Sequence, residues 1–339
     1  MLPDLLLCLA APACVLLLTP PVLRWTSQRE MLDMPSARSS HEQPTPRGGG
    51  LGIVLGVLLT AALQLSLGHT LNGIHIALLG GGIVVALTGW LDDRGGLGSY
   101  VRLSLYGLAS AWAVFWLGGL PSLEYGVGTL HLGGLGYVLS WAAIMLLTNI
   151  FNFMDGIDGI AATEAATVGV TVATLLFLGG DQPLAVLAAS LGLGSAAFLI
   201  WNWHPARIFM GDVGSNFLGF TIAVLAIASE GRHSLPALIW VLLLGVFVVD
   251  GSATFVRRLL RRKPPHEAHK THAYQGAVQR GHSHSKVTLA VLLIDVALGA
   301  LAWLAWRRPV LLVPSVGGAF TLLLALHWHY SPLRRPGNG

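Results

Sequence analysis

Two neighbouring acids, Asp92 and Asp93, follow a long apolar run and precede Arg94. Adjacent carboxylates repel each other and are disfavoured near a membrane unless a cation holds them. Magnesium prefers oxygen ligands and keeps substrate phosphates in its shell. The pair therefore predicts a magnesium (Mg2+) site, beside which Arg102 is placed to bind phosphate oxygens. The alternative interpretation is a polar helix end without chemistry.

A second polar group runs from Asn149 to Gly159. Asn149, Asn152 and Asp155 recur every three residues, so on a helix they share one face. Asp158 follows in a stretch with two glycines, which break the helix and let the backbone approach a ligand. Amides and carboxylates at a membrane boundary are costly without a role, so this group predicts part of an active site rather than a polar loop.

A third group contains Asn202, Pro205 and Arg207, and ends at Asp212, which stands near two glycines just before another apolar run. The free amides of a helix N-terminus favour anionic ligands. A carboxylate at that place is better suited to bind a metal ion that in turn holds the anion. Asp212 is therefore a predicted magnesium ligand.

Five histidines lie in the basic segment 257–286, namely His266, His269, His272, His282 and His284. Zinc is one interpretation, because His269 and His272 have i,i+3 spacing and further histidines follow. The many Lys and Arg residues around them would repel a metal ion. Histidines that bind a diphosphate are more consistent with acids elsewhere supplying magnesium ligands.

The elements that position these groups are apolar. The sequence has 339 residues, of which 54% are hydrophobic and 11% are charged, whereas soluble domains carry about 25% charged residues. A bilayer span needs about 20 apolar residues. Apolar runs lie at 3–23, 49–68, 72–91, 101–119, 134–150, 161–179, 183–201, 214–229, 235–256, 287–306 and 309–328. We predict an all-α polytopic membrane protein with about 11 transmembrane helices, or about 10, in a single domain over 1–339.

Positive charge predicts the orientation, because Lys and Arg collect in cytoplasmic loops. With the N-terminus periplasmic and the C-terminus cytoplasmic, all but three of the 20 Lys and Arg residues fall inside. The exceptions are Arg232, Arg307 and Arg308. The predicted cytoplasmic loops, at about 24–48, 92–100, 151–160, 202–213 and 257–286, hold the polar groups described above. No soluble module is left to bind nucleic acid.

The order of these motifs resembles the polyprenyl-phosphate N-acetylhexosamine-1-phosphate transferases of glycosyltransferase family 4. The resemblance covers almost the whole chain and includes Pro44-Thr-Pro-Arg47-Gly-Gly-Gly50, the Asp92-Asp93 pair and the Gly211-Asp212-Val213-Gly214-Ser215 run. It implies transfer of a sugar 1-phosphate from a UDP-N-acetylhexosamine, or a deoxy relative, to undecaprenyl phosphate. UMP leaves and magnesium is required. It also implies an enzyme of the bacterial inner membrane with a cytoplasmic active site, and a homodimer is consistent with it.

The same resemblance implies residue roles. Catalytic roles fall to Asp92, Asp93, Asp155 and Asp158. The magnesium ligands are Asp212, Asp92 and Asp93. The residues expected to bind substrates are Asn149, Asn152, Asn202, Arg102, His269, His272 and His284.

Alternatives remain at three levels. The pattern of the peptidoglycan enzyme, phospho-N-acetylmuramoyl-pentapeptide transferase, has a run of consecutive histidines at this place. This chain instead reads His269-Lys-Thr-His272. That departure favours an enzyme that starts O-antigen or related surface glycans. Direct attack by the lipid phosphate is favoured over a covalent aspartyl intermediate. A transporter is the rival class, but transporters place ionisable residues near the bilayer midplane, and here only Asp295 lies clearly in mid-run.

Overall fold

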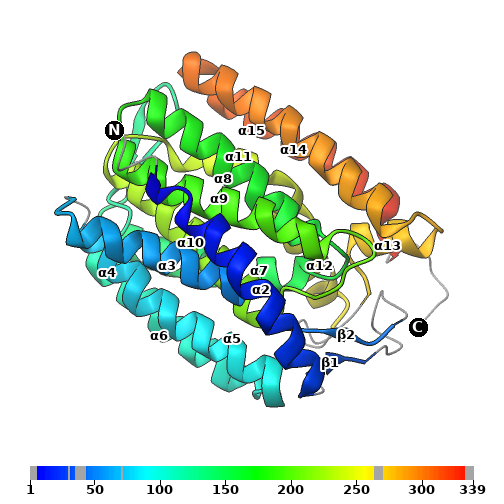
Figure 1. Ribbon diagram of the computed structural model, residues 1–339. Coiled ribbons are helices and arrows are strands. Elements are labelled where there is room, and N and C mark those ends of the chain that lie inside the picture. Colours follow the sequence, from blue (N-terminus) through cyan, green and yellow to red (C-terminus); the bar gives the residue numbers. More distant parts are fainter. Residues whose placement is uncertain (1–5, 30, 35–42, 70–71, 263–269, 333–339) are drawn as a thin grey trace.

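The computed structural model describes residues 6–29, 31–34, 43–69, 72–262 and 270–332. Long helices lie side by side in a bundle (Figure 1). The first half of the chain forms α2 (Ala10–Gln28), α3 (Leu51–Ser66), α4 (Asn72–Ala77), the π-helix η1 (Leu78–Gly82), α5 (Ile83–Gly95), α6 (Ser99–Leu117) and α7 (Leu135–Met154). The second half forms α8 (Ile160–Leu178), α9 (Gln182–Asn202), α10 (Asp212–Gly231), α11 (Ala237–Leu243), α12 (Gly245–Leu260), α13 (Ala273–Gln279), α14 (His284–Arg307), the 3-10 helix η2 (Pro309–Leu311) and α15 (Leu312–Tyr330).

Every predicted apolar run overlaps at least one of these helices. Among the described residues, seven helices are long and apolar enough to cross a membrane, or up to eight if the bent pair α11 and α12 is one span. α3 falls short because it has 16 residues, and α2 and α6 are also not among the seven. The chain is thus a polytopic, mainly helical membrane protein, while the count of about 11 spans and the orientation stay predictions.

Helix α10 forms the centre of the bundle. All of its residues from Val213 to Glu230 are buried, and it packs against α5 and α7. At the periphery the pattern reverses, since α15 exposes large apolar side chains such as Leu322, whose exposed fraction is 69%. Apolar residues on the outside and a fully enclosed central helix are what a lipid solvent favours.

Helices α8 and α9 approach closely because small residues meet between them. A Cβ atom added to Gly169 would lie 2.6 Å from the Cα atom of Gly192. Packing of this kind is a main source of helix association in lipid. The acid Asp295 of α14 faces α8, since it is buried and accepts a hydrogen bond from Thr167 of α8 at 3.2 Å.

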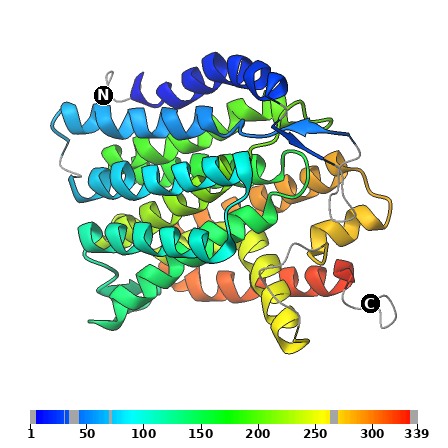
Figure 2. The same ribbon diagram turned by 90° about the horizontal axis from the view of Figure 1, so that it is seen from below.

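Two features were not predicted from the sequence. The run 235–256 is broken, because α11 and α12 meet at an angle of 78°, and α12 (yellow) turns away from the direction of the bundle (Figure 2). Two short antiparallel hairpins also form, β1 (Leu32–Asp33) with β2 (Thr45–Pro46) and β3 (Ser122–Glu124) with β4 (Thr129–His131). The β1–β2 hairpin lies at the same end of the bundle as α13 (Figure 1).

Candidate active site

The site begins where the last turn of α5 meets the first turn of α10. Gly89 makes this contact possible, because a Cβ atom there would lie 2.4 Å from the backbone oxygen of Asp212. No side chain fits in that space. The close approach of the two helices brings Asp92 and Asp93 next to Asp212, although about 120 residues of chain separate them.

Asp93 is used to hold the start of α10. Its Oδ1 accepts a hydrogen bond from Asp212 N at 2.9 Å and its Oδ2 accepts one from Val213 N at 3.1 Å. A carboxylate is stabilised at a helix N-terminus by these free amides. Gly211 has φ +74°, and a Cβ atom there would lie 2.5 Å from Asp93 Oδ2. Asp93 therefore positions Asp212.

Asp92 and Asp212 converge on one cationic group. Arg102 Nη1 of α6 lies 2.5 Å from Asp92 Oδ2 and 3.2 Å from Asp212 Oδ2. Asp92 Oδ1 accepts a hydrogen bond from Leu97 N at 2.5 Å, and Asp212 Oδ1 accepts one from Asn152 Nδ2 at 2.8 Å. Two carboxylates that share one cation form a set of oxygen donors that suits magnesium.

The end of α7 adds a third acid. Asp155 is half-buried directly after the last helical residue, Met154. Burial, together with the negative charges of Asp93 and Asp158, raises the pKa of Asp155 to about 7. Near neutral pH this carboxyl group can therefore either donate or accept a proton.

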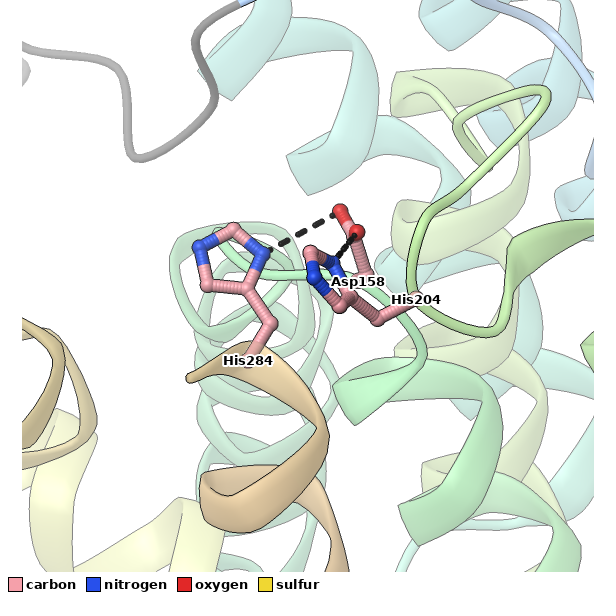
Figure 3. A group of neighbouring side chains, drawn as sticks. All are labelled: Asp158, His204 and His284. Atoms are coloured by element: carbon pink, nitrogen blue, oxygen red, sulfur yellow. Dashed lines mark hydrogen bonds and ion pairs between the residues drawn. The ribbon is translucent and has the colours of Figure 1, made fainter. Parts of the chain in front are cut away.

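A separate cluster joins Asp158, His204 and His284 (Figure 3). His204 Nδ1 lies 2.6 Å from Asp158 Oδ2, and His284 Nδ1 lies 3.3 Å from Asp158 Oδ1. Burial raises the pKa of Asp158, but hydrogen bonds with His284, His204 and the backbone amide of Ala206 outweigh that effect and hold it below its ordinary value. Asp158 is therefore an ionised carboxylate between two imidazoles.

An apolar cavity of about 610 Å³ opens beside the Asp92–Arg102–Asp212 group. Arg102 and Asn152 line its polar end, and both contact Asp212. Most of the remaining lining is hydrophobic and comes from α6, α7 and α12, including Tyr106, Trp141, Met145 and Phe255. The cavity thus connects a charged centre with an apolar trough between helices.

Comparison with known proteins identifies the family of this chain. A family model described as glycosyl transferase family 4 matches residues 75–230. A probable undecaprenyl-phosphate N-acetylglucosaminyl 1-phosphate transferase of Bacillus subtilis is 32% identical over 290 residues, which cover 83% of this chain and 78% of that protein. The chain belongs to the polyprenyl-phosphate N-acetylhexosamine-1-phosphate transferase family.

Two other relatives show the breadth of this transferase family. A decaprenyl-phosphate N-acetylglucosaminephosphotransferase of Mycolicibacterium smegmatis is 32% identical over 305 residues, covering 79% of this chain and 73% of that protein. A phospho-N-acetylmuramoyl-pentapeptide-transferase of a Synechococcus strain is 30% identical over 313 residues, covering 86% of this chain and 88% of that protein. The overall likeness therefore does not by itself separate the two kinds of sugar donor.

Three residues predicted to bind substrates in this transferase contact other parts of the protein. Asn202 is 2% exposed; its Oδ1 accepts a hydrogen bond from Gly159 N and its Nδ2 donates one to Ile208 O. His272 is also 2% exposed and lies 3.4 Å from Asp250. Asn149 donates a hydrogen bond to Met145 O of its own helix but lines the apolar cavity. His269 lies outside the described residues.

Sequence reasoning assigned no role to His204, and the structure places it in contact with Asp158. Its signal was weak, a lone imidazole next to Pro205 in a predicted loop. Asp250 also lies between two histidines, His272 and His327, with Ala273 N donating to its carboxylate at 2.9 Å. Asp250 therefore anchors the start of α13.

Proposed function

We propose that the protein transfers an N-acetylhexosamine 1-phosphate from a UDP-sugar to undecaprenyl phosphate and releases UMP. The observation that carries this proposal is the apolar cavity whose polar end is lined by Arg102, because the guanidinium of Arg102 also contacts the carboxylates of Asp92 and Asp212. A lipid phosphate has the same two parts, a long hydrocarbon chain and one charged end.

The reaction exchanges one phosphorus–oxygen bond for another. An oxygen of the lipid phosphate forms a bond to the sugar-bearing phosphorus of the donor. The bond from that phosphorus to the bridging oxygen breaks, and UMP leaves with the bridging oxygen. A phosphate near pH 7 is already largely ionised, so this step depends mainly on positioning and on charge neutralisation. Direct attack is therefore favoured over an aspartyl intermediate.

The protein residues divide this work. Arg102 holds the lipid phosphate at the mouth of the apolar cavity, where its guanidinium already neutralises two carboxylates. Asp155, with its pKa near 7, takes the remaining proton from the lipid phosphate when one is present. Asp93 and Asn152 orient Asp212. Asn202 holds the loop after α7 to the loop before α10, which favours a positioning role over the predicted donor contact.

The donor set suits magnesium, since Asp92 and Asp212 direct carboxylate oxygens toward one cationic position. These two residues would hold the ion. When bound, magnesium supplies positive charge to the diphosphate and to the departing UMP. Asp93 is less suited as a ligand because both of its oxygens accept backbone hydrogen bonds.

N-acetylglucosamine is the favoured sugar, because it is named in the relatives from Bacillus subtilis and Mycolicibacterium smegmatis. The product would start a lipid-linked surface glycan such as O-antigen. Positive charge in the short loops supports a bacterial inner membrane location with the site facing the cytoplasm. The N-acetylmuramoyl-pentapeptide donor is the alternative, named in the Synechococcus relative.

The test uses the protein purified in detergent, with undecaprenyl phosphate, magnesium and a panel of UDP-sugars that includes UDP-N-acetylmuramoyl-pentapeptide. UMP release is measured. We expect release with one N-acetylhexosamine, loss of release with EDTA, and a decrease of at least about 100-fold in Asp212→Asn. The control is Glu124→Gln, whose acid lies in hairpin β3–β4. If folded protein released UMP from none of the UDP-sugars in the panel, the proposal would be contradicted.

A further inference from the structure

The cluster of Asp158, His204 and His284 differs in chemistry from the magnesium position. It offers two imidazole nitrogens and one carboxylate, and its candidate ligand atoms all lie within 4.8 Å of one another. Magnesium prefers an all-oxygen shell, whereas two histidines with one carboxylate are a typical set for zinc and related transition metals.

We propose that Asp158, His204 and His284 bind a divalent transition metal ion of the zinc class, at a site separate from Asp92 and Asp212. The three ligands come from three segments, the loop after α7, the loop after α9 and the first residue of α14 (Figure 3). A metal ion there would join these three segments to one another. This inference does not depend on the proposed reaction.

The distances agree with such a site. Zinc bonds to nitrogen and oxygen are about 2.0–2.1 Å long, so neighbouring ligands in a tetrahedron lie roughly 3.3 Å apart. Asp158 Oδ1 and His284 Nδ1 are 3.3 Å apart. His204 Nδ1 is closer to the carboxylate, at 2.6 Å, as expected for a hydrogen bond. The His204 side chain is 39% exposed, so it has room to move back when a metal ion replaces the proton.

The surroundings hold the carboxylate in place. Ala206 N donates to Asp158 Oδ2 at 3.1 Å, and Thr288 Oγ1 of α14 donates to the backbone oxygen of Asp158 at 2.8 Å. Such supporting contacts orient metal ligands and contribute to affinity. Because His204 is exposed while Asp158 and His284 are buried, a metal ion can enter from one side and keep an open coordination position.

A second carboxylate, that of Asp250, also lies between two histidines. Asp250 lies 3.0 Å from His327 Nδ1 and 3.4 Å from His272 Nδ1. However, its oxygens also accept hydrogen bonds from the backbone amides of Ala273 and Tyr274, and both imidazoles are buried. Two backbone amides already contact its oxygens, compared with one for Asp158, and neither neighbouring imidazole is exposed as His204 is, so we assign no metal to Asp250.

The test measures metal content of the full-length protein in detergent. Protein stripped with EDTA is dialysed against micromolar zinc in the presence of millimolar magnesium, and bound zinc is measured by mass spectrometry. We expect about one zinc ion per chain, and a cobalt-substituted protein with the visible absorption of nitrogen-ligated Co2+. His204→Ala and His284→Ala should each weaken zinc binding by at least about 10-fold.

Two control variants separate this site from others. His233→Ala removes an exposed imidazole that lies 2.6 Å from Glu124, a pair that is not part of a three-ligand group among the described residues. It should bind zinc like the wild type, and so should Asp212→Asn. The proposal is overturned if the wild type binds no zinc, or if zinc binding persists in both His204→Ala and His284→Ala. Size-exclusion profiles of the metal-free variants verify folding.

Discussion

At the scale of single residues, the neighbours Asp92 and Asp93 have different surroundings. Asp92 meets Arg102, whereas Asp93 accepts hydrogen bonds from two backbone amides of α10. Loss of a carboxylate at a helix N-terminus costs about 0.5–2 kcal/mol, while removal of one of two facing carboxylates also relieves repulsion. Replacing Asp93 should therefore lower the stability of the folded protein more than replacing Asp92 does.

We expect Asp93→Asn to lower the midpoint of thermal unfolding by about 2–4 °C, because its amide cannot accept both backbone hydrogen bonds. Asp92→Asn should change the midpoint by less than half as much as Asp93→Asn does. It should lower UMP release at least as strongly as Asp93→Asn does. Both quantities are measured on the same detergent preparations. A midpoint that falls further in Asp92→Asn than in Asp93→Asn would reverse the assigned roles.

Asp155 should give the folded protein a measurable dependence on pH. Its folded pKa is raised to about 7 from 3.8, so between these values the folded state holds a proton that the unfolded state has lost. Stability from this group is then greatest below the lower value, falls as pH rises, and levels off above about pH 7.

The corresponding variant is Asp155→Asn, which cannot ionise. In EDTA, its unfolding midpoint relative to the wild type should rise by about 2–4 °C from pH 5.5 to pH 7.5 and stay constant above that. Asp33→Asn serves as the control, since its acid lies in the β1–β2 hairpin. A midpoint difference that does not change between pH 5.5 and 7.5 would show that the pKa of Asp155 is not raised in the folded protein.

At the scale of elements, the site depends on how closely α5 approaches α10. We expect Gly89→Ala to force the two helices apart, because the added Cβ atom would lie 2.4 Å from backbone oxygen. A displacement of about 1 Å in an active site costs on the order of 100-fold in rate, so UMP release should fall by at least about 10-fold. The matched variant is Gly95→Ala in the same helix, where an added Cβ has no neighbour within 4 Å. Equal activity in the two variants would contradict the importance of this contact.

At the scale of the whole molecule, orientation is set by charge rather than by packing, because Lys and Arg resist translocation. Two glycines with open space around them, Gly98 before α6 and Gly231 at the end of α10, allow a direct measurement. In a background where Cys8 and Cys14 are replaced by serine, Gly231→Cys should react with an impermeant maleimide on cells with a permeabilised outer membrane. Gly98→Cys should react only after the inner membrane is opened. The reverse pattern would invert the predicted topology.

The amino-acid sequence by itself determined the class of protein and the gathering of its motifs. Apolar runs of about 20 residues form helices almost wherever they occur in lipid, because each helix satisfies its own backbone hydrogen bonds. Polar groups confined to the loops between such runs must collect at the ends of the bundle. The family resemblance implied that Asp92, Asp93 and Asp212 belong to one group, this pattern is consistent with it, and the structure brings the three residues together.

Only the tertiary structure decided which polar groups meet and what each one contacts. Asp93, Asn202 and His272 look like ligands in the sequence, yet they hold backbone or buried partners. His204 carried no clear signal and joins Asp158. Periodicity reports which residues face lipid or loop, but contacts between segments far apart in sequence depend on local shape, such as the missing side chain of Gly89. Partner choice is therefore a property of packing, which the linear pattern does not contain.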